Sequence, residues 1–285
     1  MREALFDTRQ RRLHIWMDSK GLRKEDQMGR FTRVLGIVAV VVPLAAATVV
    51  AQSRSFAGTW KMNLAKSHLG GMVYTISRTP SGMMHYSGGG FEADFDLTGK
   101  EHVMPSGVGI IGKELSPTSW DLTFRMNGKT VQRSHLTVNG NSISNVANAI
   151  GADGKTVQQK TVDTRVSGGP GFSGKWKGGE VAGAATTLRI TLDGANGITL
   201  TLPEFQTSVK GKFDGKDYPV VQSAQATKFT NAFSKEGKTI KVIGKLNGKL
   251  FTEEIYTLSA NGKTLTDEST AVATGEKTKA LFDRQ

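Results

Sequence analysis

The chain of 285 residues contains no cysteine. Disulfide bridges, thiolate nucleophiles and cysteine-ligated metals are therefore excluded. Proline is scarce, with seven residues, whereas glycine is abundant, with 34. This composition is typical of a turn-rich globular β protein and not of a disordered chain. The length favours two domains, each large enough to bury a core.

Long apolar runs are also lacking, with the exception of VLGIVAVVVPLAAATVVA at 34–51. Arginines precede this run, a proline interrupts it and small residues end it, which is the pattern of a secretory signal peptide cleaved after Ala51. We expect a helical signal segment at 28–51, with translation starting at Met28. Residues 1–27 are then an N-terminal extension that we expect to be disordered.

The signal segment predicts an exported protein, periplasmic or extracellular. Eighteen helical residues span only about 27 Å, which is marginal for a bilayer. A single-pass anchor through 34–51 is the alternative, and it is the one membrane contact that the sequence suggests. Residues 1–51 carry nine basic and five acidic side chains, so the remainder keeps +8 of the net charge of +12. We expect no nucleic-acid partner, because export separates the chain from most nucleic acid and no basic and aromatic stripe is present.

One hexapeptide occurs in two similar copies, FAGTWK at 56–61 and FSGKWK at 172–177. The same offset of 116 residues relates LTGKEHVM at 97–104 to FDGKDYPV at 213–220. Matching segments in matching order indicate an internal duplication.

A third pair, GADGKTV at 151–157 and SANGKTL at 259–265, matches at an offset of 108 and implies a deletion of about eight residues in the second copy. The glycines and proline of SGGPGFSG at 167–174 are typical of a linker. We therefore expect two domains, the first at 52–168 and the second at 169–285.

Strand patterns dominate each repeat. Apolar and polar residues alternate in FEADFDL (91–97), WDLTFRM (120–126) and TLRITL (187–192), as in strands with one buried face. Asn-Gly-Lys and Asp-Gly-Lys triplets between such stretches are typical of tight hairpins. The sequence predicts an all-β fold of two tandem antiparallel up-and-down β-barrels with about eight strands each. β-sandwiches are the alternative.

Catalytic and cofactor motifs are absent. The Gly-Lys-Thr turns lack the glycine that a phosphate-binding loop needs five residues earlier. His68, His85, His102 and His135 lack the close spacing of metal ligands. We therefore expect no cofactor and no metal.

The first repeat also contains a serine in a glycine-rich stretch and a cluster of acidic residues. Ser87 in HYSGGG lacks a nucleophile elbow and is interpreted as a loop residue. Glu92, Asp94 and Asp96 share one strand face, which favours a solvated surface over a calcium site or paired acids. The sequence predicts a non-catalytic protein, and an enzyme on a barrel scaffold is the least supported function.

The motif Phe-x-Gly-x-Trp-Lys, opening a series of hairpin-linked strands, resembles the start of lipocalins and fatty-acid-binding proteins. In that superfamily Gly-x-Trp begins the first strand, and the tryptophan closes one end of a ligand-holding barrel. The resemblance implies that Trp60 and Trp176 are plug residues. It also implies a late-strand arginine over the tryptophan, for which Arg165 is placed in the first repeat, whereas STAV (269–272) offers none in the second.

The alternation predicts aromatic side chains on inward faces, as core residues or as the lining of a cavity. The candidates are Tyr74, Phe91, Phe95, Trp120, Phe124, Phe205, Phe213 and Phe229. The first hypothesis is a secreted lipocalin-like module that carries or sequesters a small apolar molecule. The second is a non-catalytic structural or interaction protein of the cell surface, whose filled barrels bind an anionic polymer or a protein.

Overall fold

A computed structural model describes residues 55–285, except 105, 152 and 223–224. The predicted extension at 1–27 and the signal segment at 28–51 lie outside the described residues. None of the helices in the described part has the length and apolar character needed to cross a membrane. These helices are the 3-10 turns η1 (Leu64–Lys66) and η2 (Pro203–Phe205).

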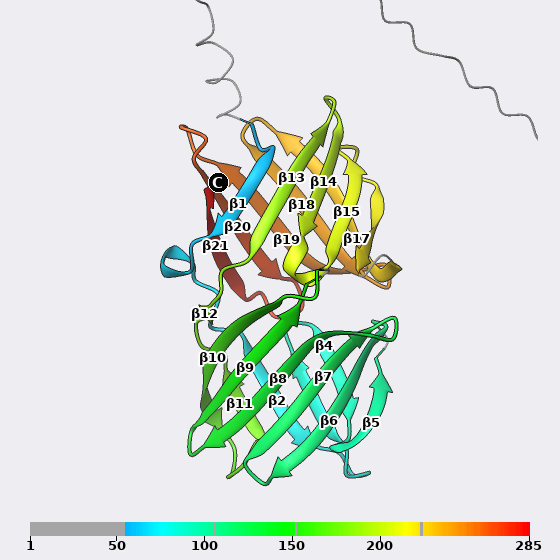
Figure 1. Cartoon of the computed structure of the whole chain (residues 1–285), viewed down its shortest axis with the longest axis vertical. Coiled ribbons are helices and arrows are strands. Elements are labelled where there is room, and N and C mark those ends of the chain that lie inside the picture. The colour runs from blue at the N-terminus through cyan, green and yellow to red at the C-terminus, as the bar shows by residue number, and fades with distance from the viewer. Residues whose placement is uncertain (1–54, 105, 152, 223–224) are drawn as a thin grey trace, which may run out of the picture. The chain divides into compact units, whose positions relative to one another are not determined.

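The described residues form two antiparallel sheets of ten strands each, which confirms the all-β barrel prediction (Figure 1). The first sheet closes on itself and is called the closed barrel. Its strands are β1 (Gly58–Met62), β13 (Thr187–Asp193), β14 (Gly197–Leu202), β15 (Thr207–Lys212), β16 (Asp217–Gln222), β17 (Gln225–Glu236), β18 (Thr239–Leu246), β19 (Lys249–Leu258), β20 (Thr264–Ala271) and β21 (Lys277–Arg284).

The second sheet is nearly closed and is called the open barrel, because its end strands β4 and β5 do not complete the ring. Its order is β4-β3-β2-β11-β10-β9-β8-β7-β6-β5, and the short β12 pairs with β10. The strands are β2 (Val73–Arg78), β3 (Met84–Gly88), β4 (Phe91–Phe95), β5 (Thr98–Val103), β6 (Val108–Ser116), β7 (Ser119–Met126), β8 (Lys129–Asn139), β9 (Ser142–Ile150), β10 (Thr156–Ser167), β11 (Gly174–Lys177) and β12 (Ala182–Gly183).

The hairpin turns follow the expected chemistry. Asn127 and Gly128, like Asn247 and Gly248, both have positive φ angles, as a two-residue type I′ turn requires. Each barrel nevertheless has ten strands and not about eight, because turns without an Asn-Gly-Lys or Asp-Gly-Lys triplet also end strands. Gly89 and Gly90, for example, separate β3 from β4.

The first strand of each sequence repeat belongs to the sheet of the other repeat. β1 pairs with β13 and β21, so Trp60 lies beside Leu188 and Arg284. β11 pairs with β2 and β10, so Trp176 lies beside Tyr74 and Arg165. In Figure 1 the blue β1 accordingly lies next to the red β21. The repeats at 52–168 and 169–285 therefore exchange their first strands.

Two segments carry the chain between the barrels, at 63–72 and 178–186, and are called the crossing segments. They bond to each other: Gly71 N donates to Gly178 O and Gly178 N donates to Met72 O, both at 2.8 Å. A Cβ on Gly70 would lie 2.7 Å from the backbone of Gly179, so this close approach requires glycine. SGGPGFSG at 167–174 is not a crossing segment, because it connects β10 to β11 within the open barrel.

The exchange also corrects the alignment of the repeats. Arg165 on β10 and Arg284 on β21 occupy equivalent positions, so the β9–β10 turn corresponds to the β20–β21 turn. GADGKTV at 151–157 lies in the former, but SANGKTL at 259–265 lies between β19 and β20. The match at an offset of 108 therefore pairs two turns that are not equivalent and differ by one hairpin. The Gly-Lys-Thr turns have similar sequences throughout the chain, which explains the false match.

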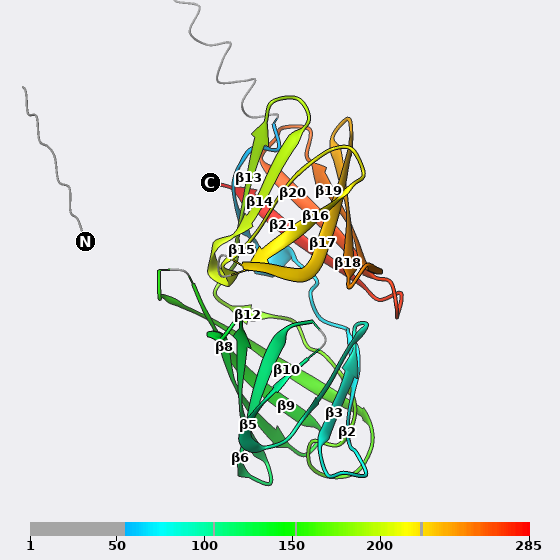
Figure 2. The same ribbon diagram turned by 90° about the vertical axis from the view of Figure 1, so that its right-hand side faces the viewer.

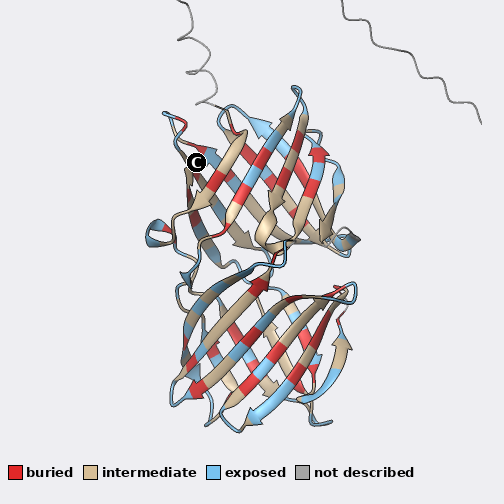
Figure 3. Cartoon of the chain, viewed as in Figure 1, coloured by how far each residue is buried: buried red, intermediate tan, exposed pale blue. Residues whose placement is uncertain are grey.

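Each barrel has its own apolar core. Figure 3 shows buried positions alternating with more exposed ones along the strands, and Figure 2 shows both curved sheets from a second side. The closed barrel is centred on Trp60, Phe233 and Leu265, all 0% exposed. The open barrel is centred on Ile143 and Trp176, also 0% exposed.

Candidate functional site

Trp176, the predicted plug of the open barrel, is buried beneath an arginine. Its indole is fully buried and its Nε1 donates a hydrogen bond to the carbonyl of Phe172 (2.8 Å). The guanidinium carbon of Arg165 lies 4.0 Å from the indole centroid, which is cation–π geometry. Arg165 also donates to the carbonyls of Gly171 and Ser173 in the β10–β11 loop and of Gly140 in the β8–β9 turn, so it joins two backbone segments over the indole.

Trp60 makes the same arrangement in the closed barrel. Its Nε1 donates to the Phe56 carbonyl (2.9 Å), and Arg284 lies 4.1 Å above its ring. Arg284 in turn donates to the carbonyls of Ala57 and Gly262 (2.8 and 2.7 Å). Burial lowers the pKa of Arg284.

The expected pairing of Arg165 with Trp60 is therefore corrected: Arg165 packs on Trp176, and Arg284 serves Trp60. Sequence reasoning missed Arg284 because it inspected STAV at 269–272, on β20, one strand too early. The glycine of each motif has a positive φ, 152° for Gly58 and 150° for Gly174, which disfavours other residues, and it lies close to the arginine. A Cβ on Gly58 would lie 2.6 Å from Nη1 of Arg284, and one on Gly174 would lie 2.9 Å from Nη1 of Arg165.

A cavity of about 440 Å³ lies inside the open barrel. The structure places in its wall all five aromatic residues that the sequence nominated from the first repeat, namely Tyr74, Phe91, Phe95, Trp120 and Phe124. Further apolar lining comes from Ile76, Ala93, Ile110, Leu122 and Leu136. A volume of this size and an apolar wall are typical of small-molecule sites.

The aromatic wall rests on the plug. Trp120 stacks on Phe172 with ring centroids 3.7 Å apart, and Phe95 contacts Trp120 edge-on at 6.5 Å. The carbonyl of Phe172 accepts the hydrogen bond of the Trp176 indole. Phe172, in the loop before β11, therefore links the wall of the cavity to Trp176.

The crossing segments complete the cavity. Leu69, Gly70 and Met72 from one segment line it, together with Gly178, Gly179 and Val181 from the other. A Cβ on Gly179 would lie 2.1 Å from the carbonyl oxygen of Val162, so only glycine fits there. Sequence reasoning missed these residues, for which the available signal was a glycine pair in each segment, at 70–71 and 178–179.

One carboxylate lies in the cavity wall. Asp163 on β10 is 8% exposed and accepts hydrogen bonds from the Tyr74 hydroxyl (2.5 Å) and the Gly179 backbone N–H (3.0 Å). Burial, and then the hydrogen bond to Asp163, raise the pKa of Tyr74, so its phenol stays protonated and remains a donor. Burial and the nearby charges of Asp163 and Glu276 raise the pKa of Tyr86 to about 12.

The three aromatic residues nominated from the second repeat lie elsewhere. Phe205 belongs to η2, Phe213 lies between β15 and β16, and Phe229 on β17 contacts Phe251 edge-on with ring centroids 5.7 Å apart. None of the three lines the open-barrel cavity. The two barrels are thus unlike inside, although their plugs match.

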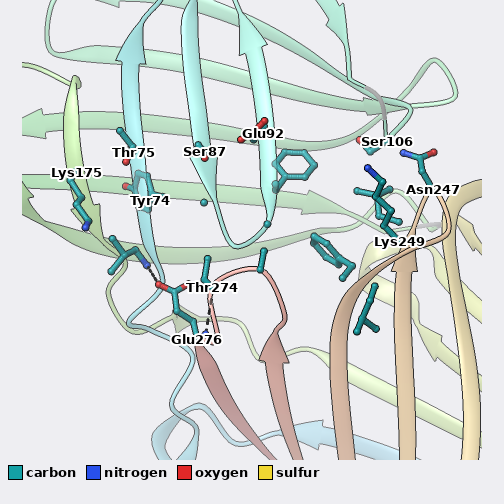
Figure 4. A pocket seen from close by; sticks show the side chains of 18 residues that line it. Tyr74, Thr75, Ser87, Glu92, Ser106, Lys175, Asn247, Lys249, Thr274 and Glu276 are labelled. Atoms are coloured by element: carbon teal, nitrogen blue, oxygen red, sulfur yellow. Dashed lines mark hydrogen bonds between the residues drawn. The ribbon is translucent and has the colours of Figure 1, made fainter.

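A cleft of about 880 Å³ lies beside the cavity and shares Tyr74 and Phe91 with it (Figure 4). Its wall joins β2–β4 to the β18–β19 and β20–β21 turns. Glu276 accepts a hydrogen bond from the backbone N–H of Val73 (2.6 Å), as Figure 4 shows. Lys175 and Lys249 also border the cleft.

The histidines of the open barrel pair with neighbouring acids. His85 bonds to Asp94 (2.6 Å), His102 to Asp96 (2.9 Å) and His135 to Asp121 (2.7 Å). Two of the three acids suggested as a calcium or acid–base cluster are therefore hydrogen-bonded to histidine. Within the described residues, no group of three potential metal ligands comes together.

Two acidic side chains face the interior of the closed barrel. Glu254 and Asp267 share the inner face with Tyr256, whose hydroxyl donates to Glu254 (3.0 Å). The side chains as a whole are only partly buried, but the carboxyl groups are enclosed by the barrel, and the solvation of the carboxyl group sets its pKa. Burial raises the pKa of Glu254, and burial and repulsion from Glu254 raise that of Asp267.

We expect Asp267→Asn to stabilise the closed barrel at pH 8. A carboxyl whose pKa is raised by folding contributes stability that is fully present below its unfolded pKa, near 4, and is lost as the pH rises through the folded value. Each unit of raised pKa corresponds to about 1.4 kcal/mol. The variant should therefore gain at least about 1 kcal/mol in urea unfolding at pH 8 and little at pH 4. Asn145 occupies the equivalent position in the open barrel, so asparagine fits this fold.

Glu253→Gln is the matched control for that experiment, because Glu253 neighbours Glu254 but pairs with Lys241 at the surface. It should leave the pH profile unchanged. Parallel profiles for wild type and Asp267→Asn would contradict the assignment.

No family model, no curated protein and no solved structure matches this chain. The geometry of the site therefore carries the functional argument.

Proposed function

We propose that the open barrel binds a small, mainly apolar molecule and that the protein is an exported, lipocalin-like carrier. The observation that carries this proposal is the apolar cavity of about 440 Å³ above the Trp176 plug. Binding cavities in proteins typically measure about 300–1,000 Å³. A barrel that only had to be stable would gain by filling this space, because empty apolar volume costs about 24 cal/mol per Å³.

The two ends of the cavity support binding over catalysis. The plug end is fixed by the arginine and indole contacts. The other end is bordered by the glycine-rich crossing segments and adjoins the cleft, which gives a molecule a direction of entry. The polar groups in the wall are few, and an apolar ligand needs no more than a few to fix its orientation.

The test is titration of the full-length protein with N-phenyl-1-naphthylamine, a neutral dye whose fluorescence rises in apolar surroundings. We expect the dye fluorescence to rise to saturation. An extract from which the natural lipids were removed and then added back should reverse this rise. Absence of a saturable signal would reject the proposed function.

Ala93→Phe locates the binding. Ala93 is 5% exposed and lines the cavity, so a phenyl group there occupies the space a ligand needs. We expect at least a tenfold loss of dye affinity, with folding checked by circular dichroism. Ala260→Phe, the same substitution at an exposed turn, should leave binding unchanged. Full binding by a folded Ala93→Phe variant would place the site elsewhere.

A further inference from the structure

The charge in the lining of the open-barrel cavity is negative. Asp163 supplies a carboxylate, and the remaining polar side chains are neutral: Tyr74, Tyr86, Gln132, Ser134, Asn145 and Thr161. None of the described lining residues is lysine, arginine or histidine. An anionic group entering this wall would therefore meet a carboxylate without a compensating cation, at a depth where charges are poorly screened.

Arg165, Lys175 and Lys249 do not line the cavity. Arg165 covers the outer side of the plug and holds three backbone carbonyls. Lys175 and Lys249 line the cleft and not the cavity. A ligand anion inside the barrel would thus have no partner for its charge.

The wall has spare capacity to accept hydrogen bonds. Asp163 accepts one bond on each oxygen, and a carboxylate has about four acceptor positions. The amide of Asn145 also lines the cavity, and its Oδ1 has no partner within the described part of the chain. Gln132 Nε2 donates a hydrogen bond to Ser134 Oγ at 3.0 Å. Asp163 and Asn145 can therefore each accept a hydrogen bond from a ligand that donates one.

We infer that the molecule bound in the open barrel is neutral or cationic and donates a hydrogen bond, as an amphipathic alcohol or amine does, and is not a fatty-acid anion. This inference rests on the proposed function. The hydroxyl or ammonium group lies at Asp163 and Asn145, and the hydrocarbon lies against the aromatic wall.

The experiment uses three probes with the same twelve-carbon chain: dodecanol, dodecylamine and dodecanoate. Each competes with N-phenyl-1-naphthylamine for the full-length protein at pH 7.5. We expect the alcohol and the amine to displace the dye at concentrations at least tenfold lower than dodecanoate does. All three are kept below their aggregation limits so that the comparison reports the head group alone.

Asp163→Asn tests the cause. Removing the charge should narrow the difference between dodecanoate and dodecanol to about threefold or less and should weaken dodecylamine. Asp121→Asn, which removes a carboxylate from the outer face of the same barrel, should leave the wild-type order unchanged. The wild-type comparison stands even if Asp163→Asn fails to fold.

The outcomes separate the two proposals. Saturable dye binding with dodecanoate equal to or better than the alcohol and the amine would overturn the inference and leave the carrier function standing. Dye binding that none of the three probes displaces would also overturn the inference alone. A complete lack of dye binding would overturn both.

Discussion

A shortened chain of residues 63–185 is expected to fold by itself, whereas a chain of residues 52–168 is not. The 63–185 chain contains every strand of the open barrel, from β2 to β12. The 52–168 chain follows the repeat in the sequence but lacks β11, and therefore leaves β2 and β10 without the strand that joins them. It also lacks Trp176 and Phe172, the base of the aromatic wall.

The expected difference is close to all-or-none. Loss of one buried tryptophan alone costs about 3–5 kcal/mol, and a domain is stable by only about 5–15 kcal/mol. Cooperative urea unfolding, followed by tryptophan fluorescence, distinguishes the two chains. A chain of residues 52–185 is the control, because it restores β11 while retaining the unpartnered β1, and it should fold as 63–185 does. Cooperative unfolding of 52–168 would contradict the strand exchange.

The second large effect is expected from removing the plugs one at a time. Trp176→Ala should lower the free energy of unfolding of the open barrel by about 3–5 kcal/mol and leave the closed barrel unchanged. Trp60→Ala should do the converse. Each tryptophan belongs in sequence to one repeat and in space to the barrel of the other. A substitution in the first repeat therefore destabilises the closed barrel, and one in the second repeat destabilises the open barrel.

The remaining tryptophans report the result in a chain beginning at residue 52. Trp120 follows the open barrel in both variants, and Trp60 follows the closed barrel of Trp176→Ala. The closed barrel of Trp60→Ala, which keeps no tryptophan, is followed by far-ultraviolet circular dichroism. Arg165→Met and Arg284→Met are milder companions that keep apolar cover on the indole, and they should destabilise the same barrels as the matching tryptophan variants. Destabilisation of the closed barrel by Trp176→Ala would contradict the assignment of β11 to the open barrel.

Local patterns predicted the strands well because the causes of strand formation are local. Alternation in residues 91–97 and 120–126 gave the inner faces, and Asn-Gly pairs marked the turns. The same alternation nominated the aromatic residues that line the cavity. It was less useful for Phe205, which lies in a 3-10 turn, because the hydrophobicity of a residue does not say which element contains it.

The strand exchange could not be predicted in this way, because pairing partners are chosen by tertiary packing. FAGTWK and FSGKWK are compatible with either sheet, since both barrels offer an arginine and a neighbouring strand end. The course of the crossing segments decides which sheet each hexapeptide joins. In the sequence these segments are marked only by glycines, which resemble turn residues. The acidic pair Glu254 and Asp267 was missed for a related reason: its members become neighbours only once β19 and β20 pair.

The exchange sets an order of events during synthesis. The last strand of the open barrel leaves the ribosome soon after its first nine, so that barrel can assemble while the rest of the chain is still being made. β1 emerges before all of them, yet its partner β21 ends at Arg284, more than 200 residues later. β1 is thus paired with β21 long after it has been made, and the closed barrel is completed only once β21 has been synthesised.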